Sequence, residues 1–131
     1  MKKLILTAAL MLILAVSAFA APLEITKQTG DFTVVSSLDR NPPVKGKNTV
    51  SIVIRDKDGK AVQDAKAAVY YSMPAMPGMP AMDYKTMAEF KNGAYSAVLD
   101  LSMTGPWNVE VRFVAPPSKT MNRVSFSVDV R

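Results

Sequence analysis

The amino-acid sequence predicts an all-β protein, an antiparallel two-sheet β-sandwich of seven or eight strands preceded by a signal peptide. Three observations support this fold class. Several short segments are rich in β-branched and aromatic residues and alternate apolar with polar side chains. Proline, glycine, asparagine and aspartate separate these segments. No convincing amphipathic helix interrupts them, so one core is expected between two sheets.

The N-terminus has the order of features found in an exported protein. Lys2 and Lys3 precede a strongly apolar run, which ends in the small-residue pattern Ala18-Phe19-Ala20. We predict a signal peptide over residues 1–20 that is cleaved after Ala20. The alternative is a retained membrane anchor, since the apolar run over residues 4–21 approaches the ~18 residues that span a bilayer. Both interpretations place the protein in the periplasm or on the extracytoplasmic face of the membrane.

The remaining residues, 21–131, suit one domain. Removing Lys2 and Lys3 from the sixteen basic residues leaves fourteen against eleven acidic residues, a net charge of +3. This scattered surplus forms no basic stripe, so we expect no nucleic-acid partner. Stability must come from core packing, because the chain has no cysteine with which to form a disulfide.

The first half of this domain contains three predicted strands. Residues 31–38 (DFTVVSSL) and 48–56 (NTVSIVIRD) are rich in β-branched side chains, and the breaker run over residues 39–47 separates them. A turn follows at Asp56-Lys57-Asp58-Gly59. Residues 66–72 are interpreted as a strand, because their valine and tyrosines outweigh the helix-favouring alanines.

The second half predicts further strands joined by clear turn signals. Residues 84–91 lead through Asn92-Gly93, a strong hairpin signal, into the strand over residues 94–101. The segment 107–114 (WNVEVRFV) has the cleanest alternation in the chain, and its tryptophan is expected in the core. Residues 123–131 repeat that alternation with valine and phenylalanine on one face.

The residue types that are missing exclude most catalytic chemistry. Without histidine or cysteine, the chain has no Ser-His-Asp triad, no thiolate nucleophile and no tetrahedral zinc site of those ligands. The closest carboxylates, Asp56 and Asp58, belong to a tight turn, and the six glycines form no phosphate-binding loop. We therefore expect a protein that is not an enzyme and has no small-molecule substrate.

Four of the nine methionines stand at three-residue spacing in the segment MPAMPGMPAM, residues 73–82. The thioether sulfur is a soft, neutral donor that favours Cu(I) or Ag(I) over Cu(II) and Zn(II). It has no proton to lose, so binding should persist as the medium becomes acidic. This pattern therefore points to a site for Cu(I) or Ag(I).

The backbone preferences of this segment suggest which sulfurs come together. A polyproline II conformation would hold neighbouring methionine α-carbons about 9 Å apart. A type II turn at Pro77-Gly78 would instead bring Met76 and Met79 within ~7 Å of each other. Regular strands would then pair Met73 with Met82 on the opposite face. A further ligand would come from elsewhere, and the candidates are Met87, Met103 and Met121. Met103 is favoured, because it lies in the bend just before the 107–114 strand.

Two other interpretations of the methionine segment remain open. The side chains could form an adaptable apolar surface, packed over the end of the sandwich or docked onto a partner protein. They could also sense oxidants, because exposed thioethers oxidise reversibly to sulfoxides. The strict spacing and the stiffening prolines support metal binding about as strongly as composition supports a contact surface, so both interpretations are kept.

The chain resembles the YtkA-like family, which is related to the FixH-like proteins. The resemblance covers about residues 32–130. The elements that carry it are Asp58-Gly59, Asp64-Ala65, the MPxMPGMP loop, Gly93-x-Tyr95 and Met103-x-Gly105-Pro106-Trp107. The resemblance implies an immunoglobulin-like sandwich outside the cytoplasmic membrane, alone or joined to efflux-adaptor and copper-handling modules. It also implies a role in copper homeostasis or oxidase assembly.

The leading hypothesis is an exported module that captures Cu(I) or Ag(I) and passes it to an efflux-system or oxidase-assembly protein at the membrane. Met76 and Met79 are the central predicted ligands, and Met73, Met82 and Met103 the additional ones. The absence of histidine excludes a mixed His/Met site, so the metal would stay monovalent. The alternative is a metal-free adaptor or structural sandwich whose Met-Pro loop binds a partner protein.

Overall fold

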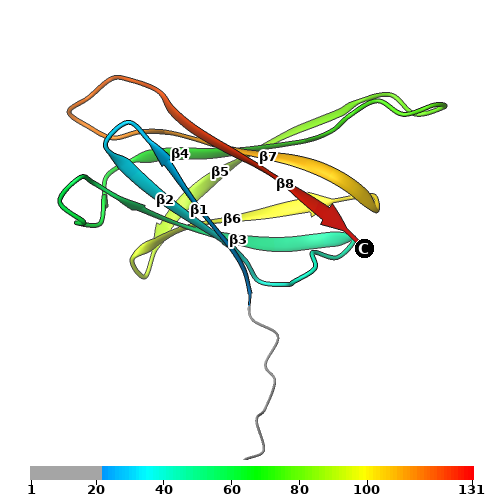
Figure 1. Ribbon diagram of the computed structural model, residues 1–131, viewed down its shortest axis with the longest axis horizontal. Helices are drawn as coiled ribbons and strands as arrows, with labels where there is room; N and C mark the ends of the chain where they lie inside the picture. The colour runs from blue at the N-terminus through cyan, green and yellow to red at the C-terminus, as the bar shows by residue number, and fades with distance from the viewer. Residues whose placement is uncertain (1–21) are drawn as a thin grey trace, which may run out of the picture.

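The computed structural model describes residues 22–131, and the predicted signal peptide over residues 1–20 lies outside this range. Within residues 22–131 the structure contains no helix long and apolar enough to cross a membrane. Eight strands make up the fold (Figure 1). They are β1 (Leu23–Thr29), β2 (Phe32–Leu38), β3 (Gly46–Arg55), β4 (Lys66–Met73), β5 (Met82–Lys91), β6 (Ala94–Leu101), β7 (Gly105–Val114) and β8 (Asn122–Val130).

The strands pair in the order β1-β2-β3-β6-β5-β4-β7-β8, and every pairing is antiparallel. The predictions of an all-β antiparallel fold and of the strand number are confirmed. The expected division into two separate sheets differs from the structure, which has one sheet curled until β1 comes close to β8. The cause is β5, which pairs with β4 over residues 82–88 and with β6 over residues 89–91. Such a partner change in mid-strand leaves no mark on the alternation pattern.

Alternating side chains from the strands fill the inside of this nearly closed sheet. The inward-facing residues of β7 are fully buried, as the sequence predicts: Trp107, Val109, Val111 and Phe113. β8 contributes a second buried row: Val124, Phe126, Val128 and Val130. The predicted turn at Asn92-Gly93 is confirmed, because both residues have positive φ, 52° and 83°, as a type I′ hairpin requires.

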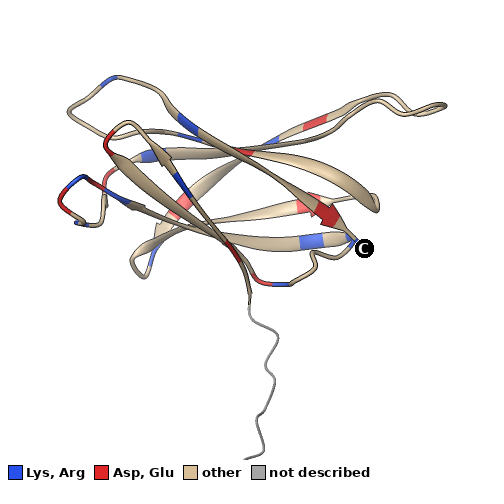
Figure 2. Cartoon of the chain, viewed as in Figure 1, with Lys and Arg blue, Asp and Glu red and all other residues tan. Residues whose placement is uncertain are grey.

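The charged residues are spread over the strands and loops without a region of a single sign, as Figure 2 shows. The projecting arm formed by the ends of β4 and β5 differs from the rest of the molecule. Residues 73–82, which form the end of this arm, carry no charge. These ten residues therefore offer apolar and thioether side chains, and the first charged residue beyond them is Asp83 on β5.

Candidate functional site: the methionine hairpin

β4 and β5 form a long hairpin whose end extends beyond the body of the protein (Figure 1). This end, residues 73–82, is called the methionine hairpin. At its base, Met73 pairs with Met82 across the two strands. At its tip, the amide of Met76 donates to the carbonyl oxygen of Met79 at 3.0 Å, and the amide of Met79 donates back at 2.8 Å. Gly78 has a φ of +79°, as the third position of a type II turn requires. The predicted Pro-Gly turn with methionines at both corners is therefore present.

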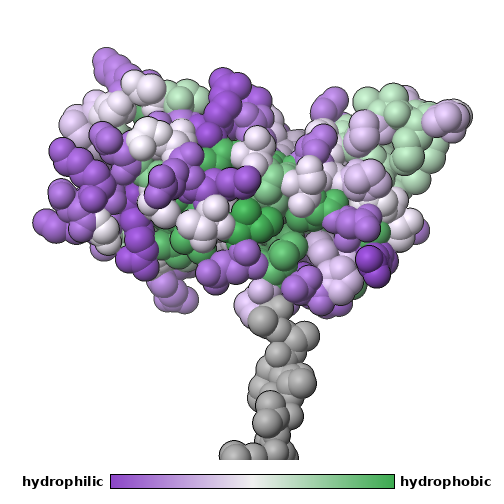
Figure 3. Space-filling view, viewed as in Figure 1, coloured by the Kyte–Doolittle hydropathy of each residue, from purple (hydrophilic) through white to green (hydrophobic). Residues whose placement is uncertain are grey.

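The prolines explain why regular pairing stops between these two methionine pairs. Pro74 and Pro80 have no amide hydrogen, so they cannot donate to the strand ladder. The chain resumes a paired geometry only at the turn, where Met76 and Met79 form an isolated bridge. Figure 3 shows hydrophobic residues gathered on this projecting arm.

The candidate ligands differ in how far they are buried. Met73 is 1% exposed and belongs to the core. Met76, Met79, Met82 and Met103 are half-buried. Met76, Met82 and Met103 also pack against the core. Regular alternation would have put Met73 and Met76 on opposite faces, but both contact the core because the proline-containing residues between them do not form a regular strand.

Met103 lies in the turn between β6 and β7, close to the base of the hairpin. Its carbonyl oxygen accepts a hydrogen bond from Nε1 of Trp107 at 2.9 Å. Gly105, two residues further on, has a φ of +120°, and a Cβ at this position would lie 3.0 Å from Cε of Met73. The turn that carries Met103 and the end of β4 that carries Met73 therefore meet at Gly105.

The other two candidate methionines lie away from this group. Met87 is 60% exposed on β5, five residues from the hairpin base. Met121 is 52% exposed and directly precedes β8. The segment between β7 and β8 lies at the opposite end of the molecule from the hairpin tip (Figure 1). The structure therefore brings only Met103 of the three candidates to the methionine hairpin.

Three aromatic rings adjoin the hairpin base, and they were not among the residues predicted for the site. Tyr71 and Tyr84 face each other across β4 and β5 and stack with 5.3 Å between ring centroids. Their centroids lie 6.0 and 6.1 Å from that of Trp107. The signal was present, because each tyrosine is two residues from a paired methionine and shares its face.

Thioethers are the metal-binding groups available at the hairpin. Among residues 22–131, no three His, Cys, Asp or Glu side chains gather as a metal site would need. Backbone pairing sets the separation of Met76 and Met79: a pair that exchanges both hydrogen bonds has α-carbons about 5.5 Å apart. Two flexible side chains that start at this distance can direct both sulfurs at one ion.

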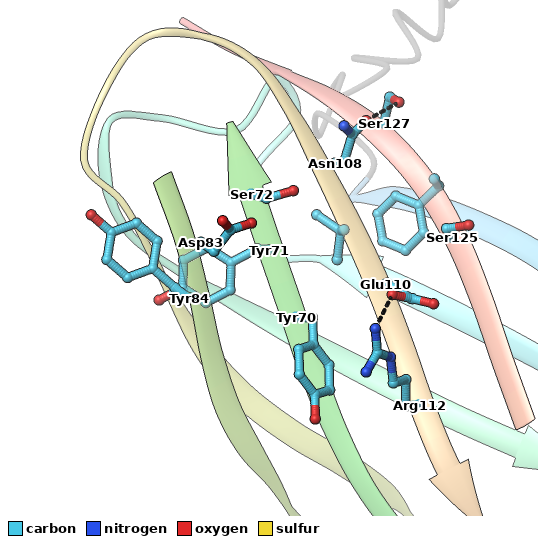
Figure 4. A pocket seen from close by; sticks show the side chains of 12 residues that line it. Tyr70, Tyr71, Ser72, Asp83, Tyr84, Asn108, Glu110, Arg112, Ser125 and Ser127 are labelled. Atoms are coloured by element: carbon cyan, nitrogen blue, oxygen red, sulfur yellow. Dashed lines mark hydrogen bonds and ion pairs between the residues drawn. The ribbon is translucent and has the colours of Figure 1, made fainter. Parts of the chain in front are cut away.

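Apart from the hairpin, a hollow lies on the outer surface of the sheet, across β4, β5, β7 and β8 (Figure 4). This hollow has a volume of about 440 Å³. Cζ of Arg112 lies 3.9 Å from the centroid of the Tyr70 ring, and Nη2 of Arg112 donates to Glu110 at 2.9 Å. That hydrogen bond raises the pKa of Arg112. Arg112 and Glu110 neutralise each other, whereas the buried Nε of Arg112 has no hydrogen-bond partner and Asp83 also lines the hollow. The sequence could not reveal it, since its residues meet only through strand pairing.

Comparisons with known proteins agree with this architecture. The chain superimposes on FetP from uropathogenic E. coli strain F11, which was expressed in the periplasm of E. coli for its crystal structure, with a TM-score of 0.57 and 11% sequence identity. The match covers 83% of this chain and 94% of that chain, and at this identity it shows a shared fold. No curated protein has a significantly similar sequence. The YtkA-like family model matches residues 26–112, and the chain therefore belongs to the YtkA-like family.

Proposed function

We propose that this protein is an exported binding module that captures Cu(I) or Ag(I) with the methionine hairpin and serves copper homeostasis, efflux or oxidase assembly. The observation that carries the proposal is the two-way hydrogen bonding between Met76 and Met79. It holds two soft donors opposite each other on the projecting arm, within a segment that has no charged side chain. An efflux-system or oxidase-assembly protein at the membrane would receive the ion.

The chemistry of the hairpin favours a monovalent soft ion. Thioethers are neutral, so they cannot offset the desolvation of a divalent ion as carboxylates or thiolates do. The half-buried side chains of Met82 and Met103 supply further sulfurs below the turn. Met73 lies behind them in the core. An ion would therefore meet the sulfurs at the tip first and those below the turn afterwards.

A binding role fits the whole chain better than catalysis. The YtkA-like fold and its likeness to FetP support a binding protein rather than an enzyme. The predicted signal peptide supports a place outside the cytoplasm. Thioethers favour Cu(I), and this chain contains no histidine to stabilise Cu(II). A carrier of this kind would therefore hold copper in the monovalent state throughout.

The second candidate function is that of a metal-free adaptor whose hairpin docks onto a partner protein. The apolar, uncharged and projecting tip favours it, because such surfaces often mark interaction sites. The two candidates differ in one result. A protein contact made by the hairpin would survive removal of copper by a chelator, whereas ion transfer to a partner would not.

A Cu(I) titration against a chromophoric chelator, under reducing conditions, tests the metal proposal directly. The wild-type protein should compete for the ion. The Met76→Ile, Met79→Ile double variant should fold but bind at least about tenfold more weakly, which corresponds to the loss of ~1.4 kcal/mol of binding free energy.

The matched control is the Met87→Ile, Met121→Ile double variant. It removes the same number of thioethers from exposed positions away from the hairpin. Its affinity should equal that of the wild type. Equal affinities in all three proteins would contradict the assignment of Met76 and Met79.

A further inference from the structure

We propose that the hairpin base forms a second, inner site for the same ion, made by the sulfurs of Met82 and Met103 against the rings of Tyr84 and Trp107. This inference rests on the proposed function, and it divides the methionines into an outer and an inner station. The ion would bind first between Met76 and Met79 and then move inward.

The spacing of the methionine pairs supports two stations rather than one cage. Met73 and Met82 are each three residues from the pair at the turn. At the rise of about 3.1 Å per residue that prolines favour, the two pairs lie ~9 Å apart along the hairpin. An ion centred between the sulfurs at the turn is therefore too far from the base to be held by all four.

The inner donors converge because the turn between β6 and β7 meets the end of β4 at the hairpin base. Met82 is held in register by its pairing with Met73. The methyl group of Met73 lies against Gly105, in the same turn as Met103. The hydrogen bond from Trp107 to the carbonyl oxygen of Met103 fixes that turn. Two half-buried thioethers therefore border one corner of the core.

The aromatic rings give this corner its preference for a monovalent cation. A cation near the face of a tyrosine or tryptophan is attracted by the ring quadrupole, most strongly when water is excluded. Tyr84 is 41% exposed, so its ring is open to an incoming ion, whereas Trp107 is fully buried behind it. Their centroids lie 6.1 Å apart. The rings and thioethers together offer attraction without formal charge, which suits Cu(I) or Ag(I).

Trp107 makes the inner station observable, because it is the only tryptophan in the chain. We would titrate the purified protein with Ag(I) and follow both bound metal and tryptophan emission. Two equivalents should bind, and emission should change with the one that occupies the inner station. The heavy ion quenches an indole only at close range, whereas the outer station lies ~9 Å further along the hairpin.

Two variants separate the stations. Met82→Leu, Met103→Leu keeps side-chain volume, and it should lose one equivalent together with the emission change. Met76→Ile, Met79→Ile should lose the other equivalent and keep the emission change. Met87→Leu, Met121→Leu is the control and should behave as the wild type. Circular dichroism and emission without metal establish that each variant is folded.

The possible results distinguish this inference from the proposed function. Binding of one equivalent to the wild type with unchanged emission overturns the inner station and leaves the outer one standing. Loss of both equivalents in the Met76→Ile, Met79→Ile variant also overturns it, because a single shared site would then explain the data. Absence of any Ag(I) binding to the wild type overturns both. The titration of the wild-type protein alone can overturn the inner station. The inference therefore remains testable even if a variant does not fold.

Discussion

Tyr95 ties two parts of the chain together through its hydroxyl group. The hydroxyl donates a hydrogen bond to the carbonyl oxygen of Val62 at 2.7 Å and accepts one from the amide of Ala65 at 3.0 Å. The ring is buried and packs against Phe90, with 5.1 Å between the ring centroids. β6 is thereby fixed to the segment that leads into β4, whose far end carries the methionine hairpin.

The Tyr95→Phe variant should lower the free energy of unfolding by about 1–3 kcal/mol, because two backbone groups lose their hydrogen-bond partner. Urea denaturation measures this change. Tyr70→Phe is a suitable control, since Tyr70 lies on the outer face, and its effect should stay below about 0.5 kcal/mol. Equal losses in the two variants would show that the hydroxyl of Tyr95 has no special role.

The same substitution should alter the dependence of stability on pH. Burial raises the pKa of Tyr95 above its ordinary value of 10.0, although the hydrogen bond from Ala65 lowers it and the charge of Asp64 raises it further. The unfolded tyrosine therefore loses its proton at a lower pH than the folded one. Stability should fall as pH rises above about 10, and less steeply in Tyr95→Phe. The free energy of unfolding is measured by urea denaturation at several pH values. An equally steep fall above pH ~10 in both proteins would contradict this assignment.

Gly105 is a second position where a single residue decides local structure. The Gly105→Ala variant meets two penalties: a φ of +120°, and a Cβ only 3.0 Å from Cε of Met73. We expect unfolding to become easier by about 1–3 kcal/mol, as measured by thermal or urea denaturation. Gly46→Ala isolates the backbone penalty, because Gly46 has a φ of +105° and open space around its Cβ position. A loss in Gly105→Ala no larger than in Gly46→Ala would mean that Met73 adapts freely.

The hairpin of β4 and β5 shows how turn chemistry would serve the proposed binding site. Local residue types determine its tip, because proline and glycine occupy the central positions of the turn and no charged side chain competes for contacts. The tip projects from the body, and of its two methionines only Met76 packs against the core. Changes at the tip should therefore affect ion binding more than the stability of the domain.

The Gly78→Ala variant tests this separation. Gly78 has a φ of +79°, so a Cβ strains the turn that aligns Met76 and Met79. We expect Cu(I) affinity to fall about tenfold, since the strain of ~1–3 kcal/mol is relieved by opening the tip. Competition against a chelator measures the change. Gly59→Ala is the control, because Gly59 has nearly the same φ, +78°, in a turn without methionines. Its affinity for Cu(I) should match the wild type.

Individual elements differed in how well the sequence predicted them. Alternation identified β7 and β8, and asparagine-glycine identified the hairpin between β5 and β6. β1 was not predicted as a strand, because its sequence LEITKQT has only two apolar residues, Leu23 and Ile25. Its pairing with β2 makes it a strand. The change of partner along β5 was also missed, since pairing between distant segments has no local signature.

At the scale of the whole molecule, the nearly closed sheet brings the β6–β7 turn to the base of the methionine hairpin. The proposed ligands gathered there are all thioethers, so the proposed ligand set carries no charge. The affinity for Cu(I) should therefore change by less than about twofold between pH 5 and pH 7.5, because a thioether has no proton to release on binding. Titrations at several pH values with a calibrated chelator measure this. An affinity that rises steeply with pH would reveal a titrating ligand and contradict a purely thioether site.

The sequence by itself determined the all-β class, most strands, the turn at Pro77-Gly78 and the pairing of Met76 with Met79. These features depend on neighbouring residues: alternation selects a strand, and proline with glycine selects a turn. Tertiary structure alone decided that the strands form one curled sheet, that Met73 is a core residue and that Met103 joins the hairpin base. It also placed Tyr84 beside Trp107. Those contacts join segments far apart in the chain, and they form only when burial of the shared core selects one strand order among many.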